Sequence, residues 1–399
     1  MNTKKARRFL TIPKELFNTV WIDKLTNIKG YISIYGSPHM RAAGGGLRVG
    51  LHLSLTDAQY IASVMYKKIK ITGPGNIKTG LPMNGAGIVL QAHPKQITPE
   101  LIIRFIKENR LIEKGIGTAA STAINIDGVC KSLGLVHLQE PIAHGLKIYD
   151  SHVKNALKLV NKNVLHPISE RHSCPTNLAT GICAAEIVDT IFEELKNKKI
   201  GIIGFGAVGG SFAHQAVLKG AIISFVANSN GSYVLRQSRK ENKKDIAILL
   251  SHIKTTLNGS LIPTLHYRGS QMIRKVSTFA EAAKMAPIDI LVIASPEGLV
   301  SSEMLIGLTS SVSIVSLANK PLSNNNTPAL SHFSNHYPSY ICNIGNAVLF
   351  SLCLLGCRVK SSDALLKRTI TCSIDIARSL FKDSKEDFLW HKIVPKYLD

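Results

Sequence analysis

The sequence lacks the features that mark membrane, secreted or zinc-binding proteins. No run approaches the roughly 20 apolar residues that cross a bilayer, and the longest apolar stretch, 347–357, predicts a short buried helix. The basic start MNTKKARRFL is not followed by the apolar run of a secretory signal. The seven cysteines include no CxxC pair and no histidine at zinc spacing. We therefore expect a cytoplasmic protein with reduced thiols, no metal site and no membrane partner.

Acidic and aromatic side chains are also scarce. The chain has 26 acidic and 48 basic residues, for a net charge of +22, and only 6% aromatics. The basic residues are spread over segments 4–8, 67–70, 196–199 and 236–244 and are not gathered with aromatics on one element. This distribution predicts no nucleic-acid partner and favours attraction of anionic substrates and cofactors.

The most informative segment present is 201–231. The apolar run 200–203 is followed by a GxGxxG turn, a helical segment and a second apolar run, 222–226. In such a strand–turn–helix–strand unit the first glycine makes the turn, the second admits a pyrophosphate and the third lets the helix approach the sheet. The pattern predicts a dinucleotide site whose turn is formed by Gly204, Gly206, Ala207, Val208 and Gly209.

The end of the second strand departs from the usual NAD pattern. An acidic residue that binds the ribose hydroxyls is expected there, but the chain has Asn228, followed by Ser229. An amide does not repel a 2′-phosphate, and Arg236, Arg239 and Lys240 follow closely. NAD and NADP both remain open as cofactors, since segment 236–244 can equally be a solvated loop.

The remaining pattern predicts an α/β protein of two domains, because 399 residues exceed one core of ordinary size. The first, 1–175, is an α/β domain, on which the helical segment 346–399 packs back; its role in substrate binding and oligomerisation is implied only by the family resemblance given below. The second, 176–345, is a Rossmann-type dinucleotide-binding domain with a parallel sheet. The expected strands are 31–35, 88–92, 200–203, 222–226, 288–294, 312–318 and 340–344. One expected helix starts at Thr56, a second runs from the N-cap Thr98 and Pro99 to about Ile112, and a third spans 180–196.

Seven short segments occur in an order that is typical of one enzyme family. They are AGGGLR (43–48) after a strand, VMYK (64–67), GLPMNGAG (80–87), NLATG (177–181), NSNG (228–231), LAN (317–319) and NIG (343–345). In this order, over about 31–355, the chain resembles the glutamate/leucine/phenylalanine/valine dehydrogenases. Segments 43–48 and 80–87 are expected to form glycine loops by this resemblance.

The resemblance implies an oxidoreductase that transfers hydride between NAD or NADP and an amino acid, keto acid or imine. By the same resemblance, Lys67 holds the substrate carboxylate, which the backbone at Gly45 and Gly46 also approaches. The implied cofactor residues outside the glycine turn are Thr180, Asn228, Ser229, Ala294, Asn319 and Asn343. A carboxylate substrate and a homo-oligomer are implied in the same way.

Two proton-handling groups of the family are missing. The catalytic lysine position holds Gly87, and the best equivalent of the catalytic aspartate is Ala120. Asp127 lies downstream and is a weaker substitute, while Lys68, Lys70 and Lys78 near an insertion can supply a lysine or remain on the surface.

Two explanations remain open. Either the chemistry has shifted to reduction of a preformed imine or ketone, which needs less acid–base help, or the protein has lost catalysis and regulates or scaffolds. In the first case the new acid–base candidates, which can equally be surface residues, are His166, Glu170, His172 and Cys174.

Overall fold

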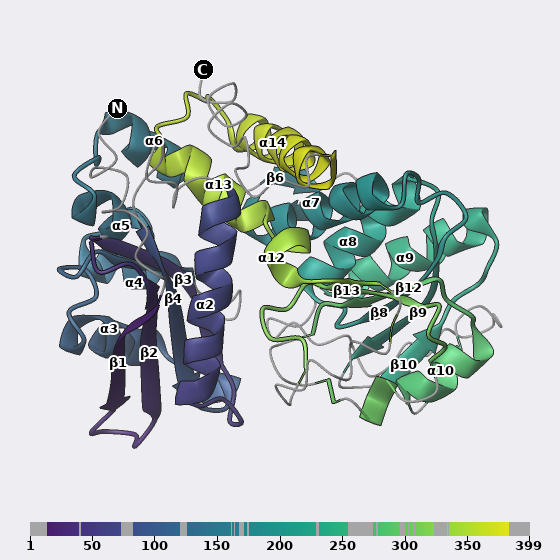
Figure 1. Cartoon of the computed structure of the whole chain (residues 1–399), viewed down its shortest axis with the longest axis horizontal. Coiled ribbons are helices and arrows are strands. Elements are labelled where there is room, and N and C mark those ends of the chain that lie inside the picture. Colours follow the sequence, from purple (N-terminus) through teal and green to yellow (C-terminus); the bar gives the residue numbers. More distant parts are fainter. Residues whose placement is uncertain are drawn as a thin grey trace, which may run out of the picture. The chain divides into compact units, whose positions relative to one another are not determined.

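The computed structural model forms two compact α/β units, Met1–Leu157 (unit 1) and Lys158–Asp399 (unit 2) (Figure 1). This confirms the α/β fold class. The predicted domain boundary at 175/176, with 346–399 returning to the first domain, stays a prediction. The described residues are 14–39, 41–72, 83–119, 126–160, 162, 164–166, 171–173, 175–228, 231–253, 274–276, 278–295, 300–301, 303–305, 308–322, 333 and 335–382.

Unit 1 contains a five-stranded mixed sheet in the order β1-β2-β4-β3-β5. β2 pairs antiparallel with β1 and β4, whereas β3 runs parallel to β4 and β5. The strands are β1 (Lys14–Ile22), β2 (Lys29–Gly36), β3 (Ala42–Val49), β4 (Met83–Gln91) and β5 (Ile116–Ala119), and the helices are α2 (Leu55–Thr72), α3 (Pro99–Glu108), α4 (Ile126–Leu133), α5 (Glu140–Gly145) and α6 (Ser151–Val160), with a 3₁₀ turn at Pro94–Gln96.

Alternation along the strands of unit 1 assigns its two faces. Ile32 and Ile88 point to the face where α3 contributes Leu101 and Phe105, and all four belong to one apolar cluster. The neighbouring positions of β4 point to the other face, because a side chain at Gly87 would meet the backbone of α2. α2 and α3 therefore contact opposite faces of the sheet.

Local capping fixes where α2 and α3 begin. Thr98 Oγ1 accepts a hydrogen bond from Leu101 N at 3.3 Å and Pro99 occupies the first turn, as predicted. The backbone N–H and hydroxyl of Ser54 both donate to the Asp57 carboxylate at 2.7 Å. α2 thus starts one residue before the predicted Thr56, and α3 ends at Glu108, before the predicted 112.

Unit 2 contains a seven-stranded sheet in the order β11-β10-β9-β8-β12-β13-β14. The five strands from β9 to β14 are parallel, which confirms the predicted parallel sheet, and β10 is antiparallel to both its neighbours. The strands are β8 (Lys199–Ile203), β9 (Ile222–Asn228), β10 (Gly231–Val234), β11 (Arg274–Val276), β12 (Ile290–Ile293), β13 (Ser313–Ser316) and β14 (His336–Tyr337), and a separate hairpin is formed by β6 (Val164–His166) and β7 (Arg171–Ser173).

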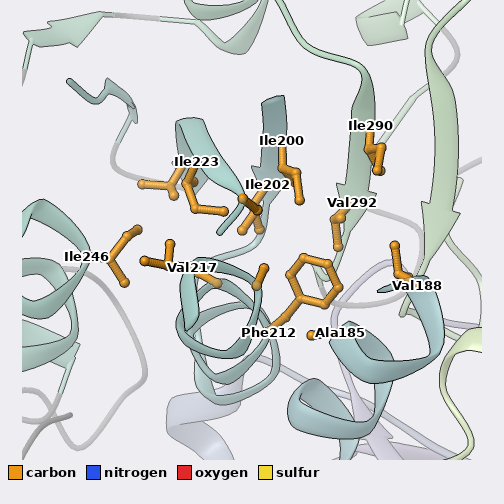
Figure 2. Packing of buried hydrophobic residues seen from close by; sticks show 14 of the residues in the cluster. Ala185, Val188, Ile200, Ile202, Phe212, Val217, Ile223, Ile246, Ile290 and Val292 are labelled. Atoms are coloured by element: carbon orange, nitrogen blue, oxygen red, sulfur yellow. The ribbon is translucent and has the colours of Figure 1, made fainter. Parts of the chain in front are cut away.

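The helices of unit 2 cover both faces of this sheet. They are α7 (Pro175–Ile191), α8 (Ala207–Leu218), α9 (Arg239–Ile253), α10 (Phe279–Met285), α12 (Ser339–Cys342), α13 (Gly345–Leu354) and α14 (Ser362–Lys382), with a 3₁₀ turn at Glu303–Leu305. α7, α8 and α9 pack on one face and α10 on the other. Figure 2 shows Phe212 of α8 between strand residues Ile202 and Val292 and the α7 residues Ala185 and Val188. Burial of such side chains supplies most of the stability of the unit.

Several predicted elements differ in the structure. Segment 340–344, predicted as a strand, contains helix α12, because Cys342 N bonds to Pro338 O at 3.1 Å in a helical turn. Residues 42–49 and 83–91 form strands β3 and β4. The prediction of glycine loops at 43–48 and at the described part of 80–87 is therefore wrong. The long helix predicted at 180–196 is α7, which begins and ends five residues earlier.

The described part of the carboxy-terminal segment, up to residue 382, is mostly helical, as predicted, and α13 and α14 both pack on α7. Cys353 and Cys372 are buried on these helices, and the described cysteines form no disulfide. Within the described part of the chain, no helix combines the length and apolarity that a membrane span requires.

Candidate functional site

The glycine turn of unit 2 has the geometry that the sequence pattern predicts. Gly204 adopts φ +92, and a Cβ there would lie 2.3 Å from Ser295 N, so only glycine fits. At Gly209 a Cβ would lie 1.9 Å from Gly204 O, because α8 approaches the turn closely. Gly206 differs from both, since among the described residues no atom outside its chain neighbours lies within 4 Å of its Cβ position. The turn is therefore closed on the sheet side and open at its middle glycine.

Helix α8 starts directly after this open position. Gly206 is its N-cap and has no side chain to bond to the first turn. The N–H groups of Ala207, Val208 and Gly209 therefore begin a helix of 12 residues without a side-chain cap. Free N–H groups and the positive end of the helix dipole form an anion site.

Other predicted cofactor residues lie at the same edge of the parallel sheet. Ala294 follows β12 and donates its N–H to Ile203 O at 2.7 Å, which places it against the turn after β8. Asn319 follows β13 and is 2% exposed. Ligands of such sheets bind at the carboxyl ends of the strands. The fold thus gathers residues that are more than 100 positions apart in sequence.

Thr180 and Asn343 belong to the same region of unit 2. Thr180 is buried on α7, and at the next residue, Gly181, a Cβ would lie 2.3 Å from Val208 O. α7 therefore touches the first turn of α8 beside Thr180. The Asn343 side-chain amide donates to Leu317 O, which ties the segment before α13 to the end of β13.

Asn228 is the last residue of β9 and is half-buried, at the strand end where a ribose contact is expected. Ser229 lies outside the described residues. The sequence therefore located the strand end correctly, and the described part of the site presents an amide where NAD proteins usually present a carboxylate.

The basic segment after β10 is not a solvated loop. Residues from 239 onward form α9, and Arg236 donates to the Asp245 carboxylate at 2.6 Å and to Glu241 at 3.2 Å. Asp245 is 0% exposed, so this pair holds the start of α9 in place. The Arg239 guanidinium donates to Asn197, and Lys240 is exposed. The Arg236 guanidinium is therefore engaged in ion pairs that stabilise the fold of unit 2.

The sequence did not reveal the partners of this arginine. Asn242 is fully buried, accepts from Ile223 N at 2.9 Å and donates to Ile223 O at 2.7 Å. The side chain of Asn242 therefore attaches α9 to β9, and the ion pair of Asp245 with Arg236 attaches α9 to the segment that follows β10. The only sequence signal is that both polar residues fall on the helix face otherwise occupied by Ile246 and Leu249.

In unit 1 the residues expected to hold a substrate carboxylate lie on β3 and α2. Gly45 is in β3 and its carbonyl accepts from Gln139 Nε2 at 3.3 Å. Gly46 faces the Arg48 guanidinium, whose Nη1 lies 2.3 Å from the position of a Cβ. Lys67 is exposed on α2, whereas the adjacent Lys68 is 3% exposed.

At Gly87, where the family resemblance places a catalytic lysine, the backbone of α2 occupies the space that a side chain would need. A Cβ at Gly87 would lie 1.8 Å from Ala58 O, and one at Gly85 would lie 2.2 Å from Ala62 O. α2 thus rests directly on β4, where these glycines alternate. The signal was present in the sequence, because Ala58 and Ala62 are four residues apart and give α2 a small-residue face.

The remaining acid–base candidates are dispersed. Asp127 is exposed in the first turn of α4, and Lys70 Nζ lies 5.2 Å above the Tyr66 ring. His166 and His172 lie in the β6–β7 hairpin, paired with Arg171 and Leu165. Outside the described residues are Lys78, Ala120, Glu170 and Cys174.

Comparisons with known proteins complete the description of the fold. Neither a family model nor a curated protein matches the sequence. A solved structure of the hetero-hexameric glutamate dehydrogenase from Thermus thermophilus matches 94% of this chain and 83% of its own, with a TM-score of 0.61 and 16% identity. The chain has the glutamate dehydrogenase fold.

A second dehydrogenase structure agrees. Glutamate dehydrogenase 2 of Plasmodium falciparum matches 97% of this chain and 81% of its own, with a TM-score of 0.57 and 18% identity. The resemblance proposed from seven short segments is confirmed at the level of fold. At these identities the glutamate dehydrogenase fold is what the comparison establishes, and activity must be argued from the site.

Proposed function

We propose that unit 2 binds a nicotinamide dinucleotide, NAD or NADP, and that the protein is an oxidoreductase acting on an amino acid, keto acid or imine. The open position at Gly206, between the closed positions Gly204 and Gly209, carries this proposal. An approaching ligand is a physical reason for glycine here, because its Cβ would meet no described atom outside its chain neighbours and its φ of −101 does not require glycine. The glutamate dehydrogenase fold supports the reaction class.

Different residues of unit 2 would bind different parts of the cofactor. The first N–H groups of α8 would bind the pyrophosphate and Asn228 the ribose. Thr180, Asn319 and Asn343 would position the nicotinamide, which supplies or accepts the hydride. The substrate carboxylate would be held by Lys67 with the backbone at Gly45 and Gly46, and Asp127 is retained as the weaker proton-transfer candidate.

The described residues favour a substrate that needs little proton transfer. Position 87 holds glycine where the family that the chain resembles has a lysine that polarises a carbonyl, and α2 occupies the space at this position. Reduction of a preformed imine or keto acid depends mainly on holding the reacting carbon against the nicotinamide. We therefore place reduction of such compounds ahead of amino acid deamination.

The packing at Gly87 also supports a second candidate function. A protein that binds the dinucleotide without turnover, and serves a regulatory or scaffolding role, needs no lysine at this position. The two candidates share the cofactor site and differ only in turnover, so one set of experiments separates them.

The first experiment is a titration of the purified protein with NADH and NADPH, followed by nicotinamide fluorescence. Gly206→Val should weaken binding by about tenfold or more, ~1.4 kcal/mol, because the branched side chain enters the pyrophosphate position. Leu218→Val is the matched control, since Leu218 is 50% exposed in the last turn of the same helix. It should leave affinity unchanged.

The outcomes separate the alternatives. If neither dinucleotide binds at millimolar concentration, or if Gly206→Val binds like the wild type, the cofactor proposal is wrong. Where binding holds, a panel of keto acids with ammonia or methylamine tests turnover. Absorbance change at the nicotinamide band above background supports the oxidoreductase, and its absence across the panel supports the non-catalytic candidate.

Assembly is a further part of the proposal. The Thermus thermophilus protein is hetero-hexameric, and we infer that this chain also forms oligomers, as homo-oligomers when expressed alone. Light scattering on the purified protein measures its mass directly. A mass of one chain, 43.4 kDa, at micromolar concentration would contradict this inference.

A further inference from the structure

Unit 1 contains a cavity on the sheet face that α3 contacts, near the start of β3, β4 and β5. Its volume is about 180 Å³. Phe17, Ile34 and Ile116 form apolar walls, and the polar lining residues are Arg41, Asn84 and Lys114. Ile34 and Ile116 belong to the same apolar cluster as the residues of α3. The cavity is therefore on the face opposite to α2 and Lys67.

A tight turn brings the two cationic residues of this cavity together. Gly115, directly after Lys114, adopts φ +65, and a Cβ there would lie 2.9 Å from Arg41 O. The Gly115 carbonyl accepts from Ala43 N at 3.1 Å. The connection from α3 to β5 is thus attached to the start of β3, and Lys114 is held beside the residue that precedes this strand.

The charges of the cavity are not balanced. No acidic residue lines it, and within the described residues neither Arg41 nor Lys114 forms an ion pair. Lys114 Nζ lies 4.8 Å from the centroid of the Phe17 ring. The nearby Glu108 carboxylate is engaged by Trp21 Nε1 at 2.6 Å. Two positive charges beside an apolar hollow favour an anion with an apolar body.

The floor of the cavity is rigid. Asn84 is 3% exposed, its Oδ1 accepts from Ser37 N at 2.8 Å, and its Nδ2 donates to Ser37 O at 3.1 Å. Each amide nitrogen carries two hydrogens, so one donor of Asn84 remains beyond the bond to Ser37. A preformed polar group reduces the entropy lost when a ligand binds.

We propose that this cavity binds a small carboxylate with an aromatic or branched aliphatic body. The carboxylate lies between Arg41 and Lys114, and the apolar body lies against Phe17, Ile34 and Ile116. The size fits, since an apolar cavity of about 150 Å³ holds benzene. The site is separate from the dinucleotide site of unit 2 and does not depend on the proposed oxidoreductase activity.

Benzoate and benzamide are matched probes for this proposal, because they have the same size and differ in charge. Calorimetric titration of the full chain should show that benzoate binds and that benzamide binds at least about fivefold more weakly. Arg41→Ala and Lys114→Ala should each weaken benzoate binding by about fivefold, the upper range for a solvent-exposed ion pair. Benzamide binding should change little in both variants.

The control substitution is Lys107→Ala, which removes an exposed lysine on α3 away from the cavity lining. It should bind benzoate like the wild type, which separates the site from the general effect of positive charge. Gly206→Val should also bind benzoate normally, so failure of the dinucleotide proposal leaves this test intact. Circular dichroism confirms that each variant is folded.

Four results would overturn the proposal. Three are equal affinity for benzoate and benzamide, unchanged benzoate affinity in both cavity variants, and no benzoate binding at about 20 mM. A drop in affinity in the Lys107→Ala control as large as in the cavity variants would likewise assign the effect to net charge and contradict a specific site.

Discussion

The two units use glycine for opposite purposes. In unit 2, Gly206 leaves open space above a helix N-terminus, and among the described residues no atom outside its chain neighbours lies within 4 Å of its Cβ position. In unit 1, Gly87 removes space, because the Ala58 carbonyl of α2 lies 1.8 Å from the corresponding point. A glycine in a family motif therefore indicates either a place for a ligand or a contact between backbones, and only the neighbours distinguish them.

The same contrast applies to positive charge. Arg236 in unit 2 follows the end of β9, where a ribose contact is predicted, but is paired with the buried Asp245. Arg41 and Lys114 in unit 1 are far apart in sequence and line one cavity without a lining carboxylate. Proximity in sequence to a predicted site is thus a poor guide to which cation serves a ligand.

The largest effect is expected from adding one methyl group at the closed glycine. Gly87→Ala should lower the free energy of unfolding by about 3 kcal/mol, the upper range for overpacking, because α2 must move away from β4. Urea denaturation followed by circular dichroism measures this. Gly206→Ala is the matched control and should cost at most about 1 kcal/mol, the typical cost of alanine at an N-cap. Equal effects at the two glycines would contradict the comparison.

Removal of the paired arginine tests the contrast in charge. Arg236→Ala leaves the Asp245 carboxylate buried without its guanidinium and should cost about 3 kcal/mol of unfolding free energy. The ratio of NADPH to NADH affinity should stay the same, since this arginine belongs to the fold. Lys240→Ala, on the exposed side of α9, should change neither quantity. A selective loss of NADPH affinity in Arg236→Ala would show that it contacts the 2′-phosphate.

A smaller effect is expected at the ribose end of β9. Asn228→Asp should favour NAD over NADP by roughly 1 to 3 kcal/mol, the range for a hydrogen bond to a charged group. The carboxylate accepts from the ribose hydroxyls and repels a 2′-phosphate. Paired NADH and NADPH titrations give this ratio. If the preference does not move, Asn228 does not face the ribose.

The smallest effect concerns pH and unit 1. The Arg104 guanidinium donates two hydrogen bonds of 2.9 Å to Asp23 and lowers the pKa of that carboxyl. A lowered carboxyl pKa stabilises the folded state above about pH 4 and loses this contribution as the pH falls further. Asp23→Asn should therefore unfold with a shallower dependence on pH between about 5 and 3 than the wild type. Identical slopes would show that this pair does not contribute.

The sequence alone predicted elements whose signals are local. The β8–turn–α8–β9 unit was predicted with its glycine roles, because strand, turn and helix preferences act within about 30 residues. Thr98 and Pro99 likewise located the start of α3. Segment 340–344 was mistaken for a strand, because a short apolar run has no helical or strand period.

Long-range packing decided the rest. That Gly87 faces a helix carbonyl, that Arg236 is held by a buried carboxylate, and that Arg41 and Lys114 share a cavity follow from contacts between segments distant in sequence. The sequence by itself determined an α/β chain with a strand–glycine turn–helix–strand unit, since those features are encoded residue by residue. Which glycines stay open and which charges stay unbalanced was decided only by the tertiary structure, because both depend on what packs against them.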